Sequence, residues 1–318
     1  MSALPLGNRA LLEDAAREIA PYVHRTPLFT SAFLSRLAGF EVRLKAENLQ
    51  KGGAFKTRGA HYKILRANPR PPGVVTFSSG NHGQAIALAA RAFGIGAVVV
   101  VPETASPAKV AAMKGYGADV VPAGRTSRDR QAKAEAIAAE RGWLLAPPFD
   151  DLDIIVGQAS AALEVLADWP EVERIAVPVG GGGLLGGTLL AASAVKPSVE
   201  VLAVEPEGAP ALARSLEAGE RVLLDRTDSV ADGLLPVQIG RLNFEIARAV
   251  GVRPRLVADG AILGALRLLL ERTKLVVEPS GAAALAGVLA GGLEPRPTAV
   301  VLSGGNVDLK TLAGYLAS

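Results

Sequence analysis

Lys56 is the residue of this chain whose surroundings best suit nucleophilic chemistry. It directly follows Phe55, with Gly52 and Gly53 just upstream, in the segment AENLQKGGAFKTRGA, and it stands where a helix is expected to begin. A lone lysine usually lies in water, but these neighbours can direct its amine into a cavity. An amine removed from water has a lowered pKa and can attack a carbonyl carbon. Lys56 is therefore a candidate nucleophile.

A run of four glycines, residues 180–183, forms a second candidate site, which we call the glycine turn. It lies in VPVGGGGLLGG, between a strand-like and a helix-like stretch. Backbone N–H groups at a helix N-terminus bind anions, so this turn predicts a phosphate. The spacing of Gly181, Gly183 and Gly186, with Glu205 about 20 residues further on, also fits a nicotinamide dehydrogenase. At this point the identity of the phosphate stays open, and a turn without any ligand is the alternative.

Two further segments place polar residues where strands are expected to end. FSSGNHGQA carries Ser78, Ser79, Asn81 and His82 into the start of a helix, and VLSGGN delivers Ser303 to a Gly-Gly turn. The amides and hydroxyls of residues 78–82 suit a carboxylate. The alternative is an ordinary serine or asparagine helix cap, although one residue would suffice for that.

The elements that must position these residues alternate along the chain. Val- and Ile-rich runs such as AVVVVP and RIAVPV are separated by Ala- and Leu-rich stretches, including a long helix expected near AILGALRLLLERT. This pattern predicts an α/β protein with parallel sheets covered by helices. Proline-containing stretches flank residues 69–147, which we interpret as a small domain inserted into a large domain of residues 1–68 and 148–318.

Composition excludes several classes of function. The chain has 318 residues, a formal charge of +3 and only 4% aromatic residues, which argues against a nucleic-acid partner. It has no cysteine, so disulfides, thiolate nucleophiles and cysteine-bound metals are excluded. No signal peptide or membrane-length apolar run is found, so we expect no membrane partner and a cytoplasmic location.

Taken together, the motifs resemble the fold-type II pyridoxal-phosphate enzymes, and most closely the threonine dehydratase and serine racemase branch. The motifs are ENLQKGGAFKTRGA, SSGNHGQA, PVGGGGLLGG, ADGL, EPSGAA and SGGN, and they follow the order of the family. The resemblance implies a two-domain fold like that of the tryptophan synthase β-subunit. It also implies pyridoxal 5'-phosphate as cofactor and assembly as a homodimer or homotetramer.

The resemblance assigns roles residue by residue. Lys56 would bind the cofactor covalently with Phe55 packed on the ring, Asn81 would hydrogen-bond the ring hydroxyl oxygen, and Glu278 would lie near the cofactor. The amides of Gly180, Gly181, Gly182, Gly183 and Leu184 would hold one monophosphate. Ser303 would meet the pyridine nitrogen. A serine carries no charge to keep a proton there, which favours prompt β-elimination over transamination.

The reaction implied is the dehydration of L-threonine or L-serine. Residues 78–82 would hold the substrate carboxylate, the Lys56 amine would remove the Cα proton, and the β-hydroxyl would leave as water, giving a 2-oxo acid and ammonia. In racemases of this family, a serine at the position of Ser79 faces the opposite side of the substrate. Serine racemisation is therefore the alternative function, and helix capping is the alternative role of Ser79.

Weaker signals complete the interpretation. Glu205 and the Ala209 carbonyl match a divalent-cation site of serine racemases, but Ala211 stands where an acidic ligand is usual. Arg128 matches a substrate-proximal arginine or is simply solvated. Biosynthetic dehydratases continue into a regulatory domain, so the resemblance favours a stand-alone enzyme. A cysteine synthase fits GNHGQ and GGGGLL poorly; a nicotinamide dehydrogenase and a non-catalytic binding protein are the distant alternatives.

Overall fold

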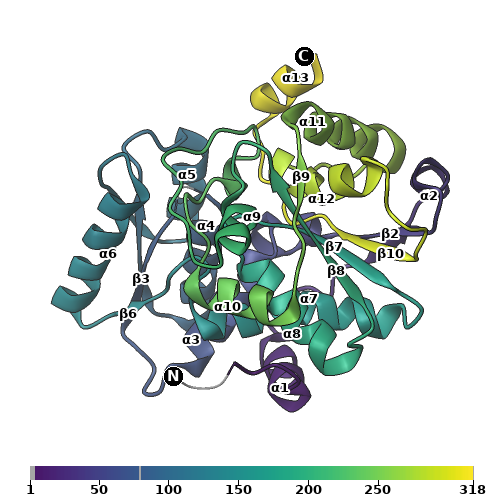
Figure 1. Ribbon diagram of the computed structural model, residues 1–318. Helices are drawn as coiled ribbons and strands as arrows, with labels where there is room; N and C mark the ends of the chain where they lie inside the picture. The colour runs from purple at the N-terminus through teal and green to yellow at the C-terminus, as the bar shows by residue number, and fades with distance from the viewer. Residues whose placement is uncertain (1–3, 79, 318) are drawn as a thin grey trace.

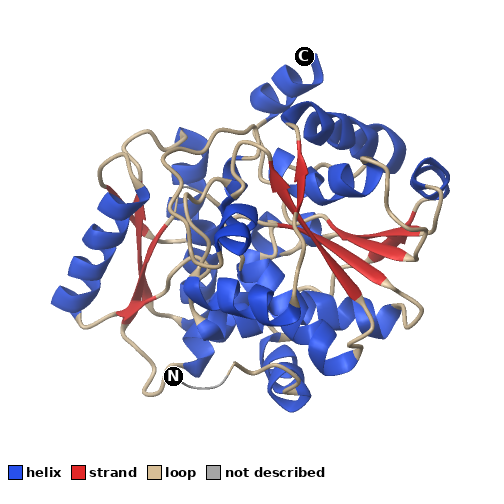
Figure 2. Ribbon diagram, in the orientation of Figure 1, coloured by secondary structure: helices blue, strands red, loops and turns tan. Residues whose placement is uncertain are grey.

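Two separate sheets organise the computed structural model, which describes residues 4–78 and 80–317. Figure 2 shows them as two groups of red strands with helices packed between and around them. One sheet has six strands in the order β1-β2-β10-β7-β8-β9, and the other has four in the order β5-β4-β3-β6. The strands are β1 (Leu28–Thr30), β2 (Val42–Lys45), β3 (Gly73–Phe77), β4 (Gly96–Val101), β5 (Asp119–Pro122), β6 (Leu144–Leu145), β7 (Arg174–Pro178), β8 (Glu200–Pro206), β9 (Arg255–Val257) and β10 (Thr298–Val301).

The helices cover both sheets, as Figure 1 shows. They are α1 (Arg9–Ile19), α2 (Ala32–Ala38), α3 (Lys56–Arg66), α4 (Asn81–Phe93), α5 (Pro107–Gly115), α6 (Ser127–Arg141), α7 (Leu152–Asp168), α8 (Gly183–Val195), α9 (Ala211–Ala218), α10 (Arg241–Val250), α11 (Asp259–Leu268), α12 (Pro279–Leu289) and α13 (Leu309–Ala317). None of the helices in the described part of the chain is long and apolar enough to cross a membrane.

The expected α/β fold with parallel sheets is confirmed, with one exception at an edge. All strand pairs are parallel except β1 with β2, where Leu28 pairs with Lys45 in an antiparallel register. The strands of the four-stranded sheet all fall between residues 73 and 145, within the segment 69–147 assigned to a small domain. The division of the chain into domains itself stays a prediction.

Alternating apolar side chains give each sheet two buried faces. In β7, Ile175 and Val177 join the core formed with α1, α7 and α8, whereas Ala176 joins the core formed with α11 and α12. In β4, Val98 packs towards α6 and Val99 towards α4. Because successive side chains of a strand point to opposite faces, the continuous Val and Ile runs of the sequence are explained by helices on both sides. The polar residues that follow the strands are not part of these cores and are available to form a site.

Candidate active site

Lys56 is the first residue of α3, at the end of a loop that crosses from β2. Its side chain is half-buried, and Nζ donates a hydrogen bond to the carbonyl oxygen of Pro148 at 2.7 Å. The Phe55 ring lies beside it, with its centroid 5.1 Å from Nζ. Burial disfavours the charged form and lowers the pKa of the Lys56 amine to about 8. The amine is therefore far more available as a base or nucleophile near neutral pH than an ordinary lysine.

The glycine turn follows the carboxyl end of β7 and leads into α8. Its glycines are needed sterically, because Gly182 has φ of +91° and a Cβ on Gly181 would lie 2.2 Å from the Phe149 ring. No described residue accepts a hydrogen bond from the backbone N–H groups of residues 180–184. Unpaired donors at the N-terminus of a 13-residue helix form a site for an anion such as a phosphate.

The segment of residues 146–150, which we call the crossing segment, joins the amine to the glycine turn. Pro148 accepts the hydrogen bond from Lys56, and its neighbour Phe149 packs on the glycine turn. Asp150 accepts hydrogen bonds from the backbone N–H groups of Arg241 and Leu242 and so caps α10. In the sequence this segment stands out only as a proline-containing boundary, because nothing in its own pattern indicates what it contacts.

Asn81, the first residue of α4, lies in a polar cluster with Glu278 and Asn306. Asn81 Nδ2 donates to Glu278 Oε1 at 2.6 Å, and Asn306 Nδ2 donates to Asn81 Oδ1 at 3.0 Å. Burial, with a smaller contribution from the charge of Asp232, raises the pKa of Glu278 to about 7. The predicted cofactor residues Asn81 and Glu278 therefore contact each other. Asn306 was missed as a site residue, although it ends the SGGN motif.

Ser303 follows β10 and joins this cluster to the Lys56 loop. Its backbone carbonyl accepts a hydrogen bond from the Phe55 N–H at 3.1 Å, and its Oγ donates to the Ser280 carbonyl at 3.3 Å. The next residue, Gly304, has no room for a side chain, since a Cβ there would lie 2.5 Å from Glu278 Oε1. Predicted site residues from β10, α4 and the Lys56 loop are thus brought together.

His82 is buried in the first turn of α4 and is held by the crossing segment. Its Nε2 lies 3.1 Å from the Ala146 carbonyl oxygen, so Nε2 must carry the hydrogen, and Nδ1 has no partner among the described residues. Burial, reinforced by the nearby charge of Lys56, lowers the pKa of His82 to about 3. His82 is therefore neutral near pH 7 and can accept a hydrogen bond, but it cannot serve as a cationic acid.

The remaining predicted residues have different surroundings. The Ser78 hydroxyl accepts a hydrogen bond from the Gly80 N–H at 3.1 Å, and Ser79 lies outside the described residues. Arg128 is exposed in the first turn of α6, and no contact joins it to any described site residue. Its predicted role at the substrate is therefore without structural support.

Glu205 is fully buried, and both of its carboxylate oxygens are occupied by the N-terminus of α9. They accept hydrogen bonds from the backbone N–H groups of Leu212 at 2.7 Å and Ala213 at 2.9 Å. Within residues 4–78 and 80–317, no group of three or more His, Asp or Glu side chains could hold a metal ion. A helix cap therefore takes the place of the alternative surface ion pair, and the role of Glu205 as a cation ligand stays a prediction.

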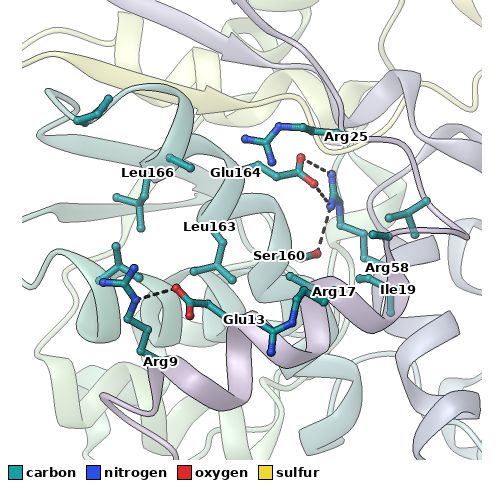
Figure 3. A pocket seen from close by; sticks show the side chains of 16 residues that line it. Arg9, Glu13, Arg17, Ile19, Arg25, Arg58, Ser160, Leu163, Glu164 and Leu166 are labelled. Atoms are coloured by element: carbon teal, nitrogen blue, oxygen red, sulfur yellow. Dashed lines mark hydrogen bonds and ion pairs between the residues drawn. The ribbon is translucent and has the colours of Figure 1, made fainter.

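A buried network of charged side chains anchors α3 just behind Lys56. Arg58 is fully buried and donates to Glu47 Oε2 at 2.8 Å and to Glu164 Oε1 at 2.7 Å, and Lys45 pairs with Glu164 as well. Figure 3 shows Arg58 and Glu164 in contact at the edge of a cavity of about 580 Å³ lined by α1 and α7. No residue of the glycine turn lines this cavity, which is separate from the candidate site.

The arrangement fits pyridoxal phosphate. It offers one desolvated amine to bind an aldehyde, unpaired amides for one phosphate, and the Asn81 and Ser303 side chains from neighbouring elements. The acid expected in a nicotinamide site, Glu205, is instead fully buried as the cap of α9, out of reach of a ribose. The residues present therefore favour a monophosphate over a dinucleotide.

Comparisons with known proteins agree with this geometry. The family described as pyridoxal-phosphate dependent enzyme matches residues 19–304. Serine racemase from Oryza sativa is 39% identical over 310 residues, covering 95% of this chain and 91% of that protein. L-threo-3-hydroxyaspartate ammonia-lyase from Saccharomyces cerevisiae is 39% identical over 308 residues, covering 96% and 94%. The crystal structure of a threonine deaminase from T.th. superposes with a TM-score of 0.90 at 45% identity, covering 95% of this chain and 99% of that one.

These findings confirm the resemblance and the cofactor, and they remove the nicotinamide and non-catalytic alternatives. The chain belongs to the pyridoxal-phosphate dependent enzyme family, within a branch that contains ammonia-lyases and amino-acid racemases.

Proposed function

We propose that this enzyme dehydrates L-threonine, and also L-serine, to 2-oxobutanoate or pyruvate with release of ammonia. The observation that carries the proposal is the Lys56 amine, whose pKa is lowered to about 8 and which is joined through Pro148 and Phe149 to a turn of unpaired amides. The likeness to a threonine deaminase structure over nearly the whole length of both chains supports the choice of substrate.

Each residue of the site has a separate role in the proposed reaction. Bound pyridoxal phosphate supplies an electron sink that acidifies the Cα–H bond of the amino acid. The start of α4, with the Ser78 hydroxyl and the Asn81 side chain, orients the substrate carboxylate. The Lys56 amine removes the proton from Cα and delivers it to the β-hydroxyl, which leaves as water. Neutral His82 offers only the acceptor Nδ1, so it adds no positive charge beside the carboxylate and does not donate to it.

A neutral partner for the cofactor ring also favours elimination. The predicted partner, Ser303, is buried at 4% exposure and is hydrogen-bonded to the Ser280 carbonyl. A hydroxyl cannot hold a proton on the pyridine nitrogen as a carboxylate would. The negative charge that forms when the Cα proton is removed is therefore poorly stabilised on the ring, which favours prompt loss of the β-substituent. This argument supports dehydration over transamination.

A substrate screen tests the proposal. The purified enzyme loaded with pyridoxal phosphate is incubated with L-threonine, L-serine, D-serine and L-threo-3-hydroxyaspartate, and 2-oxo acid and ammonia are measured. We expect the highest kcat/KM with L-threonine and no turnover by Lys56→Ala. Turnover of L-threo-3-hydroxyaspartate alone, or no ammonia from any of the four, would contradict it.

Serine racemisation is the second candidate, favoured by the likeness to the Oryza sativa protein named serine racemase. It requires a group that returns a proton to the face of Cα opposite Lys56, and the sequence position of Ser79 suits that role. Chiral chromatography of L-serine incubated with the enzyme tests it. D-serine should form with the native enzyme and not with Ser79→Ala, whereas equal D-serine from both would remove Ser79 from the reaction.

The cellular setting is part of the same proposal. The cytoplasmic location and the homodimeric or homotetrameric assembly rest on composition and on the family resemblance. Sedimentation of the purified protein checks the assembly.

A further inference from the structure

Asn243, in the first turn of α10, contacts the glycine turn although it belongs to none of the family motifs. Its side chain is fully buried. The amide Nδ2 donates to the Gly181 carbonyl at 2.9 Å and to the Phe149 carbonyl at 3.0 Å. One amide group therefore bonds both the glycine turn and the crossing segment, whose Pro148 carbonyl holds the Lys56 amine.

The hydrogen bond to Gly181 fixes the direction of a neighbouring backbone N–H. The Gly181 carbonyl also accepts from the Gly240 N–H at 3.1 Å, so two donors hold it towards α10. In a trans peptide the carbonyl and the following N–H point in opposite directions. The N–H of Gly182 is therefore directed away from α10, and it is one of the donors left without a partner in the described part of the chain.

The oxygen of the Asn243 side chain lies in an unfavourable position. This atom, Oδ1, is buried and accepts no hydrogen bond from any described residue. A buried polar atom without a partner destabilises the folded protein, and a leucine of similar shape would avoid that loss. The surroundings also fit this side chain closely, since a Cβ on Gly186 would lie 2.5 Å from Oδ1 and one on Gly182 would lie 2.7 Å from the Asn243 Cβ.

We propose that Asn243 is a positioning residue for the cofactor phosphate: its amide holds the Gly181 carbonyl so that the glycine turn presents its N–H groups to the phosphate. It acts through the backbone and does not touch the cofactor. The same amide keeps the crossing segment packed on the turn. The inference concerns how the cofactor is held, so it does not depend on which amino acid is the substrate.

The test measures cofactor affinity in the Asn243→Leu variant. Cofactor-free protein is titrated with pyridoxal phosphate and, separately, with pyridoxal, which has the same aldehyde but no phosphate. We expect the dissociation constant for pyridoxal phosphate to rise about tenfold or more. That is the effect of losing one hydrogen bond between a backbone N–H group of the turn and the charged phosphate. The constant for pyridoxal should stay within about twofold of the native value, because the aldehyde is bound by Lys56 and not by the turn.

Asn48→Leu is the matched control. Asn48 is also a buried asparagine whose Oδ1 lacks a described partner, but its Nδ2 donates to the Val276 carbonyl and does not contact the turn. It should bind pyridoxal phosphate as the native chain does. If Asn243→Leu does not fold, Asn243→Ser serves instead, because its shorter side chain cannot span both carbonyls. An unchanged affinity for pyridoxal phosphate, or an equal loss for pyridoxal, would overturn the proposal.

Discussion

Replacing Lys56 by methionine should stabilise the cofactor-free protein, because the amine that we propose as the base is held in surroundings that disfavour its charge. The pKa of Lys56 falls from the ordinary value of 10.5 to about 8. At about 1.4 kcal/mol for each pH unit, holding this amine charged in the folded protein at pH 7 costs about 3 kcal/mol. The variant also loses the hydrogen bond to Pro148, which lowers its stability by about 1 kcal/mol. We therefore expect its free energy of unfolding at pH 7 to exceed that of the native protein by about 2 kcal/mol.

The pH dependence gives the prediction its signature. Since the folded pKa lies below the unfolded one, the unfolded chain binds more protons between about pH 8 and pH 10.5, and the native protein gains stability from this group as the pH rises. Lys56→Met has no amine to titrate. Its advantage over the native protein should be complete at pH 7, disappear near pH 10, and become a disadvantage of up to about 1 kcal/mol above that, because the neutral amine of the native protein keeps its hydrogen bond.

Urea denaturation of both cofactor-free proteins between pH 7 and pH 10.5 measures this difference. Lys51→Met is the control, because Lys51 lies in the same loop and makes no ion pair with any described residue. It should change stability by no more than about 0.5 kcal/mol. A destabilised Lys56→Met at pH 7, or a gain that does not vary with pH, would refute the reasoning.

Three further predictions concern the elements around the site. Arg58→Met should destabilise the protein by about 3–5 kcal/mol in urea denaturation, because Glu47 would keep a buried charge without its ion-pair partner and Glu164 would retain only Lys45; a loss below about 1 kcal/mol would contradict this. Lys109 of α5 pairs with Asp232, and its Nζ lies near Gly80 at the start of α4, where we propose that the substrate carboxylate binds. Lys109→Ala should therefore raise the KM for the substrate by up to about fivefold with little change in kcat, and a lowered kcat at constant KM would count against it. Millimolar Mg²⁺ should leave the Tm within about 1 °C, since both oxygens of Glu205 cap α9, whereas a larger rise abolished by Glu205→Gln would restore the cation site.

Local sequence patterns were sufficient to predict the parts of the site that are local in the chain. A strand followed by glycines and a helix places the turn of residues 180–183 at a strand end, and the same reasoning places Asn81 and Ser303. Parallel strands covered on both faces give continuous apolar runs, so the α/β class could also be predicted. Lys56 stood out because glycines and an aromatic ring adjoin it in sequence.

The parts that escaped prediction depend on contacts between distant segments. Phe149 packs on Gly181, and Asn243 bonds both, but no motif marks either residue. The AILGALRLLLERT pattern predicted one long helix, whereas α11 ends at Leu268 and residues Leu269–Thr273 widen into a π-helical turn. Glu205 matched a cation ligand in sequence, and only the position of α9 shows that its oxygens are already bonded.

The covalent attachment of the cofactor to Lys56 is the claim on which the rest depends. It can be measured by adding pyridoxal phosphate, reducing with borohydride to fix the cofactor to its amine, and locating the modified lysine by mass spectrometry of the digested protein. We predict one pyridoxyl phosphate group, on the peptide that contains Lys56. Modification of a different lysine, or no stable modification, would contradict the account.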